Sequence, residues 1–359
     1  MTLKRPKILV DLGKLADIYS GLGQVSLNFG KALQQENKDR FELTYLLPKG
    51  TETYFDSKAA KFEFLSFTRR HFAFLGRQFN LWHAIHQDSA YMPGSKNTSY
   101  LLTIHDLNFL QEKSAAKAQA RLKKLQAKVN RASAVSSISQ FTAKEIEQHL
   151  ALQKKPTVTI YNGVEDITAF PKQRPFFLQK NEPFLFAMGV VKEKKNFHVL
   201  VDFLAALPVR YKLVLAGNKA GTYSKEIELL AELKGLKDRF VVCGTVSSSE
   251  KAYLLSHCEA FLFPSKCEGF GLPVIEAMQF GKPVFLSTYS SLPEIGGLHA
   301  FYWQHFEPQY MAAFFMESLK YFYDTPHMAA HMVDYAKTFS WQKNARQYIE
   351  LYSRLLNIP

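Results

Sequence analysis

Short apolar runs alternate with amphipathic segments along the whole chain. The runs are rich in β-branched and aromatic residues, whereas the segments between them repeat their apolar positions with the period of a helix. In the first half, strands are predicted at residues 7–12, 41–47, 61–67, 100–104, 133–138 and 157–161. In the second half they are predicted at residues 183–191, 211–216, 240–243, 260–263, 283–287 and, with the weakest pattern, 300–303. This alternation predicts βαβ units with parallel sheets.

The two series of strands predict two domains of the α/β class, each with a doubly wound, Rossmann-like sheet. Asn162, Gly163 and Val164 close the first series, and a polar stretch with Pro171 and Pro175 opens the second. We therefore predict a first domain at 1–165 and a second at 166–342. Ligands of open α/β sheets bind at the carboxyl ends of the strands. We expect the sheets to face a central cleft, with the functional residues in strand-to-helix loops.

The composition fits a folded protein with a large core. Of 359 residues, 47% are hydrophobic and 21% are charged, which is typical of globular domains and unlike disordered or fibrous chains. Asp11 interrupts the first apolar run, so the start does not read as a signal peptide, and no run approaches the length of a membrane span. The three cysteines, an odd number without metal-ligand spacing, indicate reduced thiols. These features predict a cytoplasmic protein.

The basic charge is concentrated in the first half. The net charge is +13, and residues 1–165 hold 24 Lys and Arg against 14 Asp and Glu, a net of +10. Seven of these cations, without one acid, fall on a helical pattern from Lys113 to Arg131. They indicate either a solvated helix face or, together with the arginine-rich and aromatic stretch from Arg69 to Trp82, contact with an anionic membrane surface. Nucleic acid is a third possibility, which no recognisable binding motif supports.

The most informative segment is residues 263–286, FPSKCEGFGLPVIEAMQFGKPVFL. A strand is predicted to end near Phe263, and a loop with two glycines leads into a helix whose first turn tolerates Pro273. Backbone N–H groups at such a turn suit a diphosphate, and glycines let a ligand approach the backbone. Glu268 precedes the helix and Glu276 lies one turn into it. Because a carboxylate can accept two hydroxyls, the pair suits a ribose and a second sugar.

With both glutamates and the GFGLP core between them, the chain resembles the retaining glycosyltransferase family 4, as does the segment SSLPEIGG at 290–297. The resemblance implies the GT-B architecture, with an acceptor-binding first domain, a nucleotide-sugar-binding second domain and a final helix at about 343–359 that packs back on the first. It implies that Glu276 binds the ribose and Glu268 the donor hexose. It also implies that backbone groups hold sugar hydroxyls and phosphate at Gly269, Phe270, Gly271 and Leu272.

A lysine-rich loop, GVVKEKKN, begins at Gly189 in the next informative segment. Lysine is a compact charge that can neutralise a leaving diphosphate. Lys194 and Lys195 match the family's basic pair, and we expect Lys195 to bind phosphate. The family often has an arginine where this chain has Val190, and Lys192 is a candidate to replace it.

In the first half, His105 directly follows a predicted strand, in LLTIHDL. A histidine alone is a weak signal, but the family places one here that reaches the donor sugar near the reacting carbon. Asp106 reads as a turn residue. Gly21 and Gly23 form a GxG loop before a helix predicted from Gln24, and the family's equivalent loop lines the cleft near the diphosphate and acceptor. His105, Glu268 and Lys195 are therefore the predicted catalytic residues.

The chain contains no DxD triplet, so we expect a metal-independent hexosyl transfer without cofactors, the nucleotide diphosphate sugar being the co-substrate. A glycan or lipid-linked acceptor is expected, in bacterial cell-envelope polysaccharide or lipopolysaccharide synthesis at the inner face of the cytoplasmic membrane. Two alternatives stay open. One is a sugar-nucleotide epimerase or phosphorylase on the same fold, and the other is a non-catalytic basic protein that binds nucleic acid or membrane.

Overall fold

The chain folds into two compact units in the computed structural model, which describes residues 5–68, 78–180, 182–219 and 221–358. Unit 1 comprises residues 1–165 and 339–359, and unit 2 comprises residues 166–338. The chain thus returns to unit 1 at Phe339, slightly before the start predicted for the final helix.

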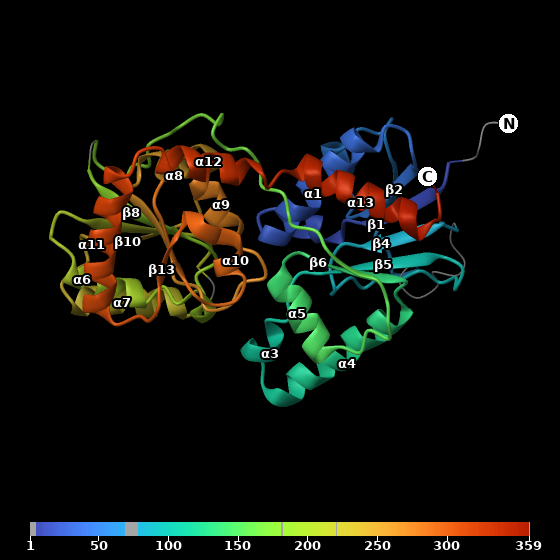
Figure 1. Cartoon of the computed structure of the whole chain (residues 1–359), viewed down its shortest axis with the longest axis horizontal. Helices are drawn as coiled ribbons and strands as arrows, with labels where there is room; N and C mark the ends of the chain where they lie inside the picture. The colour runs from blue at the N-terminus through green and yellow to red at the C-terminus, as the bar shows by residue number, and fades with distance from the viewer. Residues whose placement is uncertain (1–4, 69–77, 181, 220, 359) are drawn as a thin grey trace. The chain divides into compact units, whose positions relative to one another are not determined.

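Unit 1 contains a seven-stranded parallel sheet in the order β3-β2-β1-β4-β5-β6-β7. Its strands are β1 (Lys7–Asp11), β2 (Glu42–Leu47), β3 (Lys61–Phe64), β4 (Leu81–Ala84), β5 (Ser99–Ile104), β6 (Ala134–Ser137) and β7 (Thr157–Thr159). Its helices are α1 (Gly21–Asn37), α3 (Phe109–Glu112), α4 (Ala115–Arg131), α5 (Gln140–His149) and α13 (Trp341–Leu355), with the 3-10 turns η1 (Gly13–Asp17) and η2 (Glu52–Tyr54). Figure 1 shows α1 and α13 side by side on one face of this sheet and α4 and α5 on the other.

Strand β4 was missed by the sequence analysis, which assigned its residues to a membrane-binding stretch. The strand lies between β1 and β5, in parallel register with both. Leu81 and Trp82 are 0% and 4% exposed, so they belong to the core and the membrane interpretation of these two residues was wrong. The arginine-rich part of the same stretch, residues 69–77, lies outside the described residues.

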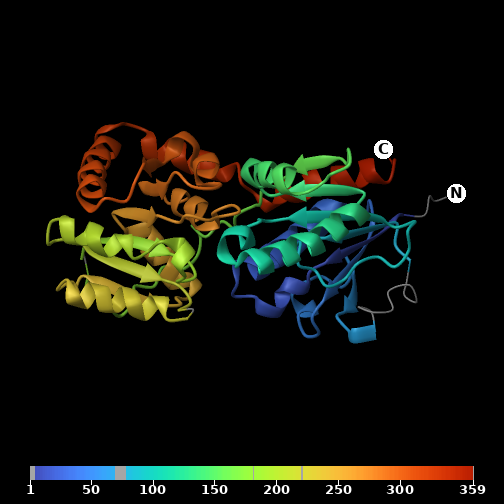
Figure 2. The same ribbon diagram turned by 90° about the horizontal axis from the view of Figure 1, so that it is seen from below.

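Unit 2 contains a six-stranded parallel sheet in the order β10-β9-β8-β11-β12-β13, which confirms the six predicted strands. Its strands are β8 (Phe184–Met188), β9 (Lys212–Ala216), β10 (Phe240–Gly244), β11 (Ala260–Phe263), β12 (Val284–Ser287) and β13 (Phe301–Trp303). Its helices are α6 (Val199–Ala206), α7 (Tyr223–Leu233), α8 (Ser248–His257), α9 (Leu272–Met278), α10 (Leu292–Gly296), α11 (Pro308–Asp324) and α12 (Met328–Lys337), with the 3-10 turns η4 (Glu193–Lys195) and η5 (Gly297–His299). Figure 2 shows helices on both sides of these strands.

Both sheets have the doubly wound strand order, in which the chain builds outward in one direction and then restarts on the other side of the first strand. The reversal falls between β1 and β4 in unit 1 and between β8 and β11 in unit 2. Ligands of such sheets bind beside the carboxyl ends of the strands at this reversal. The strand order therefore marks one candidate site in each unit.

Helix α13 is bound to unit 1 by aromatic and polar contacts. Tyr352 Oη lies 2.7 Å from His83 Nδ1, and the Tyr348 ring packs edge-on against Phe29 of α1. Asn344 Nδ2 donates to the Tyr161 carbonyl at 2.7 Å. None of the helices in the described part of the chain combines the length and the hydropathy needed to cross a bilayer.

Candidate functional site

Three loops meet at the carboxyl edge of the unit 2 sheet, one after each of β8, β11 and β12. The Lys194 carbonyl in the β8 loop accepts hydrogen bonds from Lys266 N (2.9 Å) and from Ser265 Oγ (3.3 Å) in the β11 loop. Ser287 Oγ, at the end of β12, donates to the Ser265 carbonyl. These contacts fix the loops on both sides of the strand-order reversal.

Lys195 and Glu268 form an ion pair across the reversal in unit 2. Lys195 Nζ contacts Glu268 Oε1, and each side chain is only 12% exposed. The ammonium group also lies 4.9 Å from the centre of the Phe263 ring. The structure therefore brings together two of the predicted catalytic residues, although they are 73 positions apart in the chain.

Serines of the β12 loop hold the backbone around Glu268. Glu268 N donates to Ser290 Oγ at 2.9 Å. Ser291 Oγ lies 3.1 Å from the Glu268 carbonyl and 3.0 Å from the Phe270 carbonyl. Ser290 and Ser291 thus position the glutamate loop from a separate part of the chain, a role that the sequence of segment 290–297 did not reveal.

The turn into α9 has the geometry that its glycines predicted. Gly271 caps the helix with φ 108°, a left-handed conformation that disfavours residues with a Cβ atom. A Cβ atom there would also lie 3.1 Å from the Leu292 side chain. Pro273 occupies the first helical turn, as predicted. The backbone from Gly269 to Gly271 therefore connects Glu268 to α9, which begins at Leu272 and contains Glu276.

Glu276 has a cationic partner that the sequence analysis missed. Lys251 Nζ, from helix α8, lies 2.9 Å from Glu276 Oε1, and the side chains are 22% and 14% exposed. The contact occupies one carboxylate oxygen. Nothing in the local pattern of α8 singles out this lysine, because its partner belongs to a different helix.

Exposure varies along the rest of the lysine-rich loop, since Val191 and Asn196 are 0% exposed. Gly189 directly follows β8, Val190 is 39% exposed, and Lys192 is exposed as the residue preceding η4. Asn196, the last residue of the loop, takes a left-handed conformation with φ 58°. The replacement of the missing arginine by Lys192 stays a prediction.

In unit 1, His105 directly follows β5 and is 5% exposed. Its Nε2 lies 2.8 Å from the Ile85 carbonyl, its backbone N donates to Gln87 Oε1 at 2.9 Å, and its carbonyl accepts from Thr142 Oγ1 at 3.1 Å. Burial lowers the pKa of His105 to about 4, so the ring is neutral near pH 7. Asp106 Oδ1 accepts from Asn108 N at 3.1 Å, which agrees with its interpretation as a turn residue.

The prediction of a glycine loop before a helix from Gln24 was wrong in its detail. Helix α1 starts at Gly21, and Ser20 Oγ caps it by accepting from Gly23 N at 3.0 Å. A Cβ atom on Gly23 would lie 2.0 Å from the Asp17 carbonyl oxygen, so close packing alone explains that glycine. A Cβ atom on Gly21 would have no neighbour within 4 Å among the described atoms. Of the two, Gly21 lies where a ligand has room.

The cations of helix α4 fall into two groups, one bound to unit 1 and one exposed. Arg121 pairs with Asp88, Lys128 Nζ donates to the Gln87 and Ser89 carbonyls at 2.6 Å each, and Arg131 donates to backbone carbonyls. These three cations brace unit 1. The other cations of α4 are exposed, namely Lys117, Lys123 and Lys124, as is Lys113, which precedes the helix.

Comparisons with known proteins agree with this architecture. Residues 169–339 match the family described as glycosyl transferases group 1. The serotype-specific mannosyltransferase WbdA of Escherichia coli is 28% identical over 244 residues, which cover 64% of this chain and 30% of that protein. The O-antigen chain mannosyltransferase B of Escherichia coli is 30% identical over 175 residues, covering 47% of this chain and 45% of that protein. The chain thus spans about a third to a half of these relatives.

Among solved structures, Anabaena HepE in complex with UDP-glucose has a TM-score of 0.76 and 21% identity. The match covers 98% of this chain and all of HepE. Identity at this level establishes a shared fold and leaves the ligand of this chain open. Within the ranges that the structure describes, no group of three or more His, Cys, Asp or Glu residues is arranged to hold a metal ion.

Proposed function

We propose that this GT-B chain, whose residues 169–339 match the glycosyl transferases of group 1, moves a hexose from a nucleotide diphosphate sugar to a glycan or lipid-linked acceptor, with retention of anomeric configuration. The observation that supports this most is the Lys195–Glu268 pair at the strand-order reversal of unit 2. It places a cation and a hydroxyl-binding carboxylate where doubly wound sheets bind their ligands.

Each charged residue of this site suits one part of the donor. Glu276 keeps one carboxylate oxygen outside its contact with Lys251 and would accept the ribose hydroxyls. Glu268 would accept hydroxyls of the hexose. Lys195 would leave Glu268 for the diphosphate, where negative charge increases as the bond to the sugar breaks.

A lysine at the leaving group supplies the stabilisation that a metal ion gives in other transferases, so the proposed reaction needs no metal. The leaving phosphate oxygen is itself basic enough to accept the proton of the attacking hydroxyl, so the proposal requires no separate general base.

The mannosyltransferase relatives support a bacterial surface glycan as the product. WbdA is named as a serotype-specific mannosyltransferase, and the second relative is named as an O-antigen chain mannosyltransferase. They favour mannose, whereas the HepE complex holds UDP-glucose. We accordingly propose an acceptor of the lipopolysaccharide class at the cytoplasmic face of the membrane, with the donor to be chosen between these two chemistries.

We expect one nucleotide sugar to raise the melting temperature by about 5 °C at one hundred times its Kd, because it binds only folded chain. The measurement is a thermal-shift series with UDP-glucose, UDP-galactose, GDP-mannose, ADP-glucose and the free nucleotides, each with and without EDTA. A shift that EDTA abolishes contradicts metal independence. The absence of any shift, together with no sugar transfer, overturns the proposed function. NMR of the product's anomeric proton then tests retention.

The exposed lysines of α4 support the membrane surface as a partner. Each Lys near an anionic leaflet contributes about 1 kcal/mol of attraction. Changing Lys117, Lys123 and Lys124 to Gln should therefore weaken sedimentation with phosphatidylglycerol vesicles by about 100-fold. The matched control changes the exposed Lys31, Lys58 and Lys96, which alters the net charge equally. Equal effects of the two triple variants, or equal binding to neutral vesicles, would contradict a specific role for α4.

A further inference from the structure

The loop after β4, from His86 to Ser89, lies at the strand-order reversal of unit 1. Because the sequence analysis missed β4, it assigned no role to this loop. In a doubly wound sheet this position is where a ligand is expected. His86 is 5% exposed, and its ring centre lies 5.2 Å from that of His105, which follows the neighbouring strand β5.

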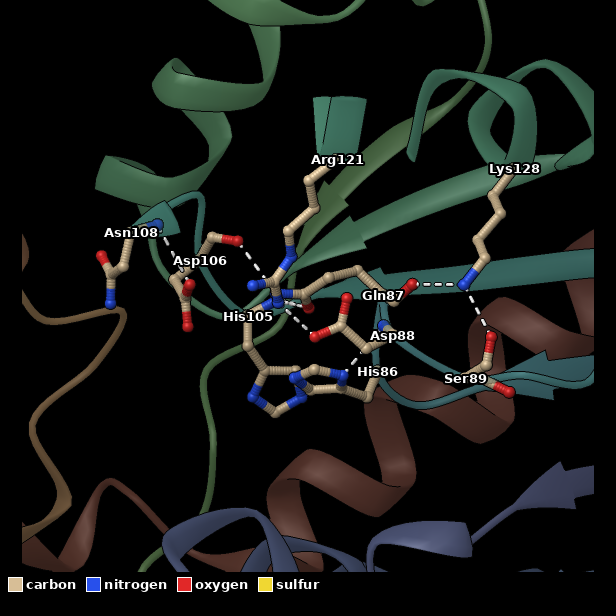
Figure 3. A network of polar contacts seen from close by, with 9 residues as sticks. All are labelled: His86, Gln87, Asp88, Ser89, His105, Asp106, Asn108, Arg121 and Lys128. Carbon is tan, nitrogen blue, oxygen red and sulfur yellow. Dashed lines mark hydrogen bonds and ion pairs between the residues drawn. The ribbon is translucent and has the colours of Figure 1, made fainter. Parts of the chain in front are cut away.

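The loop is fixed from several sides, as Figure 3 shows. Arg121 pairs with Asp88, and Lys128 donates to the carbonyls of Gln87 and Ser89. Gln87 in turn joins the two loops, because its side chain accepts from His105 N at 2.9 Å and donates to the Asp106 carbonyl at 2.9 Å. Ligand-contacting groups need such support to hold their geometry. These contacts hold the loop from His86 to Ser89 more rigidly than a connection between two strands requires.

The partners of the two histidines fix where each ring has its proton. His86 Nδ1 accepts from Asp88 N at 2.9 Å, so that nitrogen has a lone pair and the proton is on Nε2. His105 Nε2 lies 2.8 Å from the Ile85 carbonyl. Because a carbonyl only accepts, His105 has its proton on Nε2 and a lone pair on Nδ1.

Both rings are neutral near pH 7. Burial, assisted by the cations Lys14, Arg121 and Lys128 around the loop, lowers the pKa of His86 well below its ordinary range. Burial and Lys14 likewise lower the pKa of His105. Two neutral rings do not attract an anion, and a single unused lone pair between them is a poor set of metal ligands.

One nitrogen of each ring has no hydrogen-bond partner among the described residues: Nε2 of His86, which is a donor, and Nδ1 of His105, which is an acceptor. Buried polar atoms without a partner do occur in the described part of unit 1, for example Trp82 Nε1 and Tyr100 Oη, but His86 Nε2 and His105 Nδ1 are not among them. Neither nitrogen has a hydrogen bond to the described residues, and His86 and His105 are each 5% exposed.

We propose that His86 is a substrate-contacting residue that, together with His105, binds a sugar hydroxyl in unit 1. A hydroxyl is both a donor and an acceptor, so it can accept from His86 Nε2 and donate to His105 Nδ1, on one hydroxyl or on two of the same pyranose. This inference rests on the proposed glycosyl transfer and adds a residue to it. The chemistry is shared by the donor hexose and an acceptor sugar.

Two substitutions separate the donor on His86 from its structural contact. His86→Asn retains an oxygen close to the Nδ1 position, which can still accept from Asp88 N, and removes the outer N–H. His86→Gln places an amide N–H close to the Nε2 position. Loss of a hydrogen bond in a polar site predicts a kcat/KM lower by about 10-fold for His86→Asn. The melting temperature should be unchanged, and His86→Gln should recover part of the rate.

The deciding measurement compares monodeoxy sugars on the wild-type chain and on His86→Asn. The donor series is the 2-, 3-, 4- and 6-deoxy forms of whichever of UDP-glucose, UDP-galactose and GDP-mannose is used. The acceptor series is methyl α-mannoside and its monodeoxy forms. The proposal requires one deoxy compound that the wild-type chain uses about 10-fold less well than the parent sugar. His86→Asn should use this deoxy compound and the parent sugar equally well. The series in which it occurs identifies the source of the hydroxyl.

Equal losses on every deoxy compound in both chains, or full activity of His86→Asn, overturn the role of His86 while leaving the proposed function intact. Should the variants unfold, the wild-type series still decides, because a chain indifferent to every hydroxyl contradicts the proposal. A wild-type chain that uses none of the three donors overturns the proposed function and this inference together.

Discussion

Lys195→Met lowers kcat/KM for hexosyl transfer by about 10²–10³-fold, the cost typical of removing one electrostatic group that stabilises a transition state. The ammonium group lies at the strand-order reversal of unit 2 and touches Glu268. Methionine approximates the length and volume of lysine but has no charge to offer a departing diphosphate. The loss should appear mainly in kcat, because charge develops on the phosphate after the donor is bound.

The control for this experiment is an ion pair of similar burial elsewhere in the same unit. Lys212 Nζ lies 3.2 Å from Glu182 Oε1, and the side chains are 14% and 25% exposed. Lys212 begins β9, so the pair lies at the amino ends of the strands, away from the candidate site. Lys212→Met should lower the melting temperature as much as Lys195→Met does, with kcat/KM within about 3-fold of wild type. Equal kinetic losses in the two variants would show that Lys195 acts through stability alone.

Lys192→Met adds a measure of how the missing arginine is replaced. Lys192 is exposed and precedes η4 in the same loop as Lys195. If it neutralises phosphate, its loss should lower kcat/KM more than Lys212→Met does and less than Lys195→Met does. If kcat/KM is the same for Lys192→Met and Lys212→Met, Lys192 is a solvent-exposed residue that does not bind phosphate.

The alternation of strands and helices made the fold predictable, whereas strand β4 escaped prediction for an identifiable reason. The strand is only four residues long, and its third residue is His83. A histidine reads as polar in a local pattern, yet His83 is 0% exposed and bonds to Thr103 and Tyr352. Burial lowers its pKa to about 3. Partners that satisfy a buried polar side chain come from distant parts of the chain, so the pattern around His83 contains no sign of them.

The residues of the candidate site also differ in whether the local sequence predicts them. The spacing of Glu268 and Glu276 and the turn at Gly271 depend on one continuous segment, so the sequence predicts them directly. Lys251 and His86 enter through side chains or loops placed by the tertiary fold. The sequence therefore offers the charged residues of the glycine-rich segment as candidates, whereas Lys251 and His86 become candidates only from the structure.

The two glutamates should divide the reaction between them. Glu276→Gln is expected to raise the Kd of the nucleotide sugar by about 10-fold or more, the loss of one hydrogen bond to a charged group, with kcat less affected. Glu268→Gln is expected to lower kcat by about 100-fold, because an amide interacts less strongly than a carboxylate with a sugar ring that gains positive charge. Calorimetric titration of the donor and steady-state kinetics separate the two effects.

Glu182→Gln is the matched control for both, since it uncouples an ion pair of unit 2 away from the candidate site. The contrast between Glu268 and Glu276 is what tests the geometry. One glutamate precedes α9 beside the lysine expected at the leaving phosphate, and the other lies within the helix beside Lys251. Identical losses of donor affinity and kcat in Glu268→Gln and Glu276→Gln would mean that both glutamates only maintain the loop. An unchanged Kd and kcat in both variants would show that the donor does not bind at this edge of the sheet.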